Sequence, residues 1–70
     1  MLSKSDPKWN TQDVYLDFPY ETIKFRWDHS TGKVYAKHYG STESEVPYSD
    51  QSFTDATLYG DEITKDEYLK

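Results

Sequence analysis

The stretch from Tyr20 to Gly40, YETIKFRWDHSTGKVYAKHYG, decides the fold because a turn interrupts two runs of strand-forming residues. Ile23, Phe25 and Trp27 alternate with polar residues, which is the pattern of a half-buried strand. The polar run DHSTGK follows, and its Gly32 can adopt a positive φ. KVYAKHY then resumes with residues that favour strands. The stretch therefore predicts a β-hairpin.

The register of this hairpin determines which side chains reach the core, because successive side chains in a strand point to opposite faces. A turn over residues 29 to 32 would place Trp27 opposite Val34 and Phe25 opposite Ala36, on an apolar core face. A slip of one residue would instead turn the two tyrosines of the second strand inward. We predict the first register, because valine and alanine suit a core better than lysine does.

The other face of the hairpin is predicted to bind a partner because it collects cations and aromatic rings. Lys24 would lie directly opposite Lys37, which costs a few tenths to about 1 kcal/mol unless the face meets an anion or an acidic surface. The alternative is a solvated face, since lysines at exposed sheet positions also discourage pairing between molecules. The predicted partner-binding residues are Lys24, Arg26, Lys33, Tyr35, Lys37 and Tyr39.

Further elements are predicted on either side of the hairpin. Val14, Leu16 and Phe18 alternate and predict a strand that Pro19 ends. EVPY predicts a short third strand or an edge strand, and SDQSFTDATLYG predicts a helix that one of its serines caps and Gly60 stops. The last residues, EITKDEYLK, predict a second short helix with a capping box and a hydrophobic staple.

These elements predict an α+β fold, with an antiparallel sheet of three to four strands and one or two short C-terminal helices on one face. We expect a single domain over residues 13 to 70, preceded by a flexible N-terminal arm over residues 1 to 12 in which Trp9 could dock. The predicted core consists of Ile23, Phe25, Trp27, Val34 and Ala36, met by Phe53, Leu58 and Tyr68.

The composition limits the class of protein. Seventy residues allow one domain, and the absence of cysteine excludes disulfides and thiolate metal sites. Aromatic residues make up 17% of the chain, which favours a folded domain over disorder. No apolar run approaches the roughly 20 residues that span a bilayer, and the first residues lack the apolar core of a signal peptide. We therefore expect a soluble, cytoplasmic protein.

Enzymatic chemistry has little support in the sequence. Asp28, His29 and Ser30 are neighbours in one turn, and adjacent residues cannot form the successive hydrogen bonds of a catalytic triad. His29 and His38 lack the spacing of metal ligands, and no glycine-rich phosphate loop occurs. We predict no catalytic residues, no metal and no cofactor.

The distribution of charge is uneven along the chain. Residues 20 to 40 hold four cations and two acids, whereas residues 41 to 70 hold eight acids and two lysines. The whole chain has a net charge of −5. The acidic segment could serve solubility, meet a basic partner or imitate a nucleic-acid backbone.

We predict a small, non-enzymatic protein-binding module that acts as a regulator, inhibitor or accessory subunit, because tyrosine-rich surfaces make effective binding sites. One alternative is a single-stranded nucleic-acid binder that uses the hairpin face, although the chain is acidic. A further alternative is an acidic decoy inhibitor that imitates DNA and could be related to phage proteins. The charged array of that decoy would be Asp55, Asp61, Glu62, Asp66 and Glu67. Partner identity and oligomeric state do not follow from the sequence.

Overall fold

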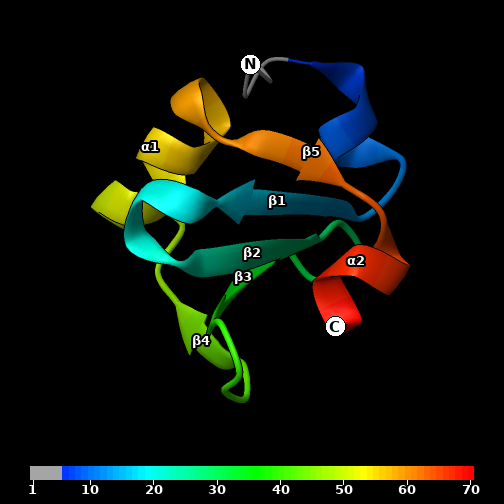
Figure 1. Ribbon diagram of the computed structural model, residues 1–70. Coiled ribbons are helices and arrows are strands. Elements are labelled where there is room, and N and C mark those ends of the chain that lie inside the picture. Colours follow the sequence, from blue (N-terminus) through cyan, green and yellow to red (C-terminus); the bar gives the residue numbers. More distant parts are fainter. Residues whose placement is uncertain (1–5) are drawn as a thin grey trace.

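The computed structural model describes residues 6 to 70 and contains one antiparallel sheet of five strands in the order β4-β3-β2-β1-β5 (Figure 1). The predicted α+β fold class is confirmed, with five strands where three to four were expected. Two single turns of 3-10 helix, η1 and η2, and two α-helices complete the fold. In chain order the elements are η1 Pro7–Asn10, β1 Val14–Phe18, η2 Pro19–Glu21, β2 Ile23–Asp28, β3 Lys33–His38, β4 Ser44–Val46, α1 Gln51–Tyr59, β5 Asp61–Ile63 and α2 Lys65–Leu69.

The hairpin of β2 and β3 has the predicted register. Trp27 pairs with Val34 and Phe25 pairs with Ala36 across residues 29 to 32. Gly32 has a φ of 72°, and its N–H donates to the carbonyl of Asp28 at 2.8 Å, which closes the turn. The odd-numbered residues of β3 therefore point away from the core, and the slipped register is excluded.

The core lies between the sheet and α1. Val14, Leu16 and Phe18 from β1 are buried together with the apolar residues of β2 and β3. Phe53 of α1 is fully buried, and its ring lies 5.6 Å from that of Phe25. The predicted core residues Ile23, Phe25, Val34, Ala36 and Phe53 are buried, and Trp27 packs against them with partial exposure.

Two predicted core contacts are wrong. Leu58 is 42% exposed, because the inward side of α1 is set by Phe53, Ala56 and Thr57. Five residues beyond Phe53 in a helix of 3.6 residues per turn, Leu58 is rotated out of this contact. Tyr68 is only 2% exposed, but it packs on the other side of the sheet. The two α-helices therefore cover opposite faces rather than one.

The two ends of α1 show how local sequence sets its bounds. Asp50, not a serine, caps the helix by accepting a hydrogen bond from the N–H of Phe53 at 3.0 Å. Gly60 ends the helix as predicted, and a β-carbon at this position would lie 2.7 Å from the carbonyl oxygens of Ala56 and Asp17. Glycine is required here because α1 and β1 approach so closely.

The described part of the predicted arm folds onto the domain. Residues 1 to 5 of that arm lie outside the described residues. Trp9, in η1, is 5% exposed and meets the ring of Trp27 edge-on at 5.6 Å. The indole N–H of Trp27 donates to the carbonyl of Trp9 at 2.7 Å. The residue that the sequence marked as able to dock is thus part of the core.

Short strands form both edges of the sheet. β4 pairs with β3, in line with the predicted edge strand, and β5 pairs with β1, which the sequence did not predict. Within residues 6 to 70, the helices are all too short or too polar to traverse a lipid bilayer.

Because the Phe53 ring is fully buried between α1 and the sheet, Phe53→Ala should lower the free energy of unfolding by about 3–5 kcal/mol. Urea denaturation followed by circular dichroism measures this change. Tyr59→Ala, on the same helix but with a 68% exposed ring, should change the value by less than about 0.5 kcal/mol. Equal effects of the two substitutions would contradict the placement of α1.

Candidate functional site

The structure brings the six predicted partner-binding residues together on the side of the sheet that faces away from α1. We call this side the outer face. Five of the residues lie on β2 and β3, and Tyr39 follows β3 directly. The outer face consists of Lys24, Arg26, Lys33, Tyr35, Lys37 and Tyr39. The expected gathering of cations and rings is therefore present in the fold.

Side chains of the same molecule neutralise the centre and rim of the outer face. Arg26 donates two hydrogen bonds to the carboxylate of Glu43, at 3.2 and 2.9 Å, and its guanidinium lies 4.2 Å from the centre of the Tyr35 ring. Lys33 lies 3.9 Å from Glu45, in a more exposed pair. Bidentate pairs of arginine and carboxylate are among the stronger polar contacts in proteins, so Arg26 is held in place.

Lys24 and Lys37 are cross-strand partners, as predicted, and α2 supplies the acceptors that make this pairing tolerable. Lys24 donates to the carbonyl of Glu67 at 2.7 Å, and Lys37 donates to the carbonyl of Tyr68 at 3.0 Å. The last carbonyls of a helix have no partner within the helix and carry partial negative charge, which favours cations. Neutral backbone carbonyls of the same chain therefore take the place of the anion or acidic surface that the sequence analysis expected next to this lysine pair.

The capping box predicted for α2 is confirmed. The hydroxyl of Thr64 accepts from the N–H of Glu67, and the carboxylate of Glu67 accepts from the N–H of Thr64, both at 3.2 Å. Tyr68 then covers part of the outer face, with its ring 5.4 Å from that of Tyr15 and its hydroxyl donating to Glu43 at 2.7 Å. A helix of five residues is stable here because the sheet holds both ends.

The pKa values of this cluster follow from its contacts. The hydrogen bonds from Arg26 hold the pKa of Glu43 below its usual range, against the opposing effect of partial burial. The same contact raises the pKa of Arg26. Burial, followed by the hydrogen bond to Glu43, raises the pKa of Tyr68. All three groups therefore keep their ordinary protonation states near neutral pH.

Tyr39 lies at the end of the outer face. Its hydroxyl donates to the carboxylate of Asp17, and this hydrogen bond raises the pKa of Tyr39 to about 12. Lys24 lies 5.5 Å from the centre of its ring. Binding by the outer face stays a prediction, and a partner there would compete with contacts that the fold already makes.

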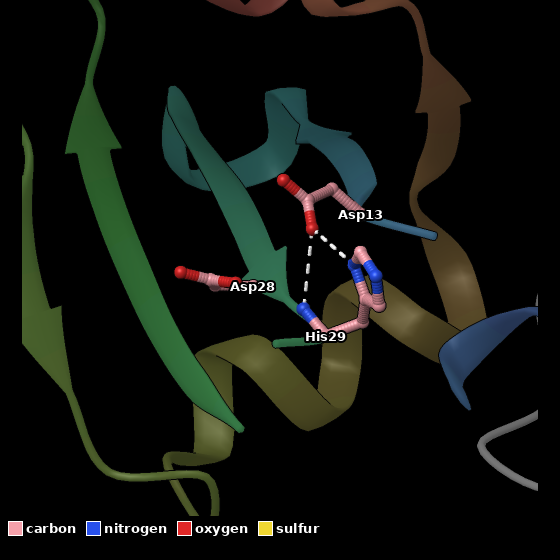
Figure 2. A group of neighbouring side chains, drawn as sticks. All are labelled: Asp13, Asp28 and His29. Atoms are coloured by element: carbon pink, nitrogen blue, oxygen red, sulfur yellow. Dashed lines mark hydrogen bonds and ion pairs between the residues drawn. The ribbon is translucent and has the colours of Figure 1, made fainter. Parts of the chain in front are cut away.

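Asp13, Asp28 and His29 form the only group of potential metal ligands found among residues 6 to 70, with ligand atoms within 4.8 Å of one another (Figure 2). Asp13 accepts from the ring nitrogen Nδ1 of His29 at 2.6 Å and from its backbone N–H at 3.2 Å. Asp28 accepts from the N–H and the hydroxyl of Ser30, which lower its pKa. The hydrogen bonds between Asp13 and His29 join the hairpin turn to the residue before β1, and those between Asp28 and Ser30 lie within the turn.

The acidic residues considered as a decoy array are divided over the molecule. Asp55 lies on α1, whereas Asp66 and Glu67 belong to α2 on the other side of the sheet. Glu62 forms an ion pair with Lys8. The five acids therefore do not line one strip, as the phosphates of a nucleic-acid backbone do.

Sequence reasoning missed a second surface, which we call the tyrosine hollow. Phe18, Tyr20, Asp55 and Tyr59 line an open depression of about 360 Å³ between η2 and α1, which lie side by side in Figure 1. Tyr20 is 80% exposed and Tyr59 is 68% exposed. Tyr20 is the central residue of η2 and Tyr59 is the last residue of α1, and the contact between these two elements is not readable from the sequence.

The fold matches proteins of a defined class. The chain is 39% identical to the immune protein Tis1 of Pseudomonas aeruginosa strain UCBPP-PA14, over 81% of this chain and 77% of that protein. A chain in the crystal structure of the complex between the type VI effector Tas1 and its immunity protein matches with a TM-score of 0.92 and 34% identity. That match covers 99% of this chain and 92% of the other. Both relatives point to the class of immunity proteins.

The family model described as Tis1 immunity protein matches residues 1 to 70. The chain belongs to the Tis1 immunity protein family. The prediction of a protein-binding module is confirmed at this level, and of the three predicted roles of regulator, inhibitor or accessory subunit the family supports the inhibitor, because an immunity protein binds and neutralises an effector. The nucleic-acid alternative gains no support, because the solved relative comes from a complex with another protein.

We expect Glu43→Gln to lower the free energy of unfolding by about 1 kcal/mol at neutral pH, because a neutral amide replaces the charged acceptor of Arg26 and Tyr68. The pKa of Glu43 is lowered in the folded chain, so the charge of Glu43 stabilises the fold above the unfolded value near 4.3. This contribution is lost as the pH falls through the lower, folded value. Urea denaturation at pH 7 and pH 3 would follow the difference between wild type and variant.

The matched control for this experiment is Glu45→Gln, in the exposed pair with Lys33, which should have an effect below about 0.5 kcal/mol at either pH. If the difference in the free energy of unfolding between wild type and Glu43→Gln were the same at pH 7 and pH 3, the charge of Glu43 would not stabilise the fold.

Proposed function

We propose that this chain is the immunity protein of a type VI effector similar to Tas1 and that it neutralises this effector by binding it directly. The observation that carries the proposal is the fold match over 99% of the chain to a chain from the complex of Tas1 with its immunity protein. Identity of 34% over such a match supports a shared mode of action as well as a shared fold.

The physical properties of the chain suit inhibition by binding. The core holds buried aromatic rings on α1, β2 and η1, so the surface is carried by a packed scaffold rather than by a disordered segment. A preorganised surface loses little conformational entropy when it binds. Exposed tyrosines add contact area with few rotatable bonds.

A cytoplasmic location, expected from the sequence, is part of this proposal. The inhibitor would meet its effector inside the cell that needs protection. Neutralisation then requires a complex that is stable at low concentrations of both proteins, and the affinity of such a complex would come from a few well-packed aromatic and charged side chains.

The proposal is tested with the Tas1-like effector from the organism that carries this chain. Bacteria that produce the effector should stop growing, and co-production of this chain should restore growth. The two purified proteins should also elute together in size-exclusion chromatography. Phe53→Ala, which removes a fully buried ring, should reduce protection because less folded protein is present.

A small acidic protein of unrelated fold serves as the control for nonspecific charge effects. Failure of the folded wild-type chain both to bind the effector and to protect the cells would overturn the proposed function.

A further inference from the structure

The tyrosine hollow offers aromatic surface that the fold leaves open. Phe18 is buried and forms its base, and the Tyr20 ring lies 5.6 Å from that of Phe18 at a tilt of 60°. Tyr59 of α1 and Asp55, one turn earlier on the same helix, complete the lining. Both tyrosines are mostly exposed, so the hollow presents two ring surfaces and one carboxylate to solvent.

Local structure fixes the two walls of the hollow relative to each other. Ser52 of α1 donates to the carboxylate of Glu21 in η2 at 2.8 Å. The left-handed conformation of Thr22, with a φ of 51°, ends η2 and directs the chain into β2. At the other end of α1, Gly60 allows the close approach to Asp17. A partner would therefore meet a preformed surface.

The surroundings of the hollow are acidic. Neither residues 9 to 23 nor residues 38 to 64 contain a lysine or arginine, so η2 and α1 contribute carboxylates and no cation. Glu21 lies beside Tyr20, and Asp55 lines the hollow itself. The C-terminal carbonyls of α1, next to Tyr59, add partial negative charge. The hollow therefore favours a positively charged partner.

The outer face differs from the hollow because its charged side chains already bind groups of the same chain. Its cations donate to groups of the same chain, at Glu43 and at the last carbonyls of α2. A partner that bound the outer face would have to replace these contacts. A partner that bound the hollow would cover exposed rings and meet the carboxylate of Asp55, which accepts a hydrogen bond from the neutral amide of Gln51 on the same helix. Neither η2 nor α1 contains a lysine or arginine, so no ion pair from these elements would have to break.

We propose that the tyrosine hollow is the surface that docks the effector and that it receives a lysine or arginine side chain of that protein. The cation would lie against the rings of Tyr20 and Tyr59 and pair with Asp55. The negative face of an aromatic ring attracts a cation, and tyrosine is enriched at binding hot spots. This inference rests on the proposed function and specifies its interface.

The first test measures the affinity of the effector for hollow variants by isothermal titration calorimetry. Tyr20→Ala combined with Tyr59→Ala should raise the Kd by at least about tenfold, since both rings are lost from the contact. Leu69→Ala is the matched control, because it removes an exposed apolar side chain from α2 on the other side of the sheet. It should leave the Kd within about twofold of wild type.

The second test addresses charge. Asp55→Lys should weaken binding by more than Asp55→Asn does, and Asp55→Asn should bind with a smaller dependence on salt than wild type because one ion pair is absent. Glu45→Lys, on β4, is the matched charge reversal away from the hollow and should have little effect. Circular dichroism would verify that each variant is folded.

The outcomes separate this inference from the proposed function. If the wild-type chain does not bind the effector, both the proposed function and the proposed docking surface are wrong. A wild-type chain that binds, with hollow variants that bind equally well, overturns the docking surface alone. In that case Lys33→Glu, on the outer face, would be expected to weaken binding instead.

Discussion

The pairing of β2 with β3 places two lysines side by side, and this constraint shapes the rest of the molecule. Like charges in this position repel, and the carbonyls at the end of α2 accept hydrogen bonds from both. The helix is too short to persist alone, and the lysines would be unfavourable without it. The lysine pair therefore stabilises α2, and α2 stabilises the lysine pair. Together they cover part of the side of the sheet that faces away from the main core.

Coverage of both sides of the sheet affects where binding can occur. α1 occupies one face through Phe53, and α2 occupies part of the other through Tyr68. The two most exposed tyrosines, Tyr20 and Tyr59, lie where η2 meets α1, at the tyrosine hollow. For an immunity protein, whose family role is to bind another protein, such a surface is better suited to docking than one whose charges serve the fold.

Sequence reasoning predicted the elements that depend on local pattern. The hairpin, its register and its turn follow from alternation and from Gly32, and the capping box of α2 follows from the spacing of Thr64 and Glu67. Contacts between distant segments were beyond such reasoning. The sequence pattern shows that Tyr68 can be buried but not on which side of the sheet. Its hydrogen bond to Glu43 and its ring contact with Tyr15 determine that side. β5 has three residues, too few for a period to be visible.

The same limit applies to the candidate sites. All six residues of the outer face could be grouped from the hairpin alone, because parity within two strands fixes their side. The groups that bind these cations, Glu43 and the last carbonyls of α2, come from elsewhere in the chain. Because of them, the cations stabilise the fold instead of standing free for a partner. The tyrosine hollow combines η2 with α1, and no repeat, motif or spacing relates the two.

The contact between Trp9 and Trp27 has a practical consequence. These are the two tryptophans of the chain, and they meet edge-on in one place, where the segment before β1 joins the hairpin. The indole fluorescence of this protein therefore comes from a single interface, the one between η1 and the hairpin. Emission from these rings would respond to opening of that interface without any added label, while the exposed phenol rings near α1 contribute little at the red end of the absorption band. Tryptophan fluorescence would therefore report whether η1 is packed against the hairpin.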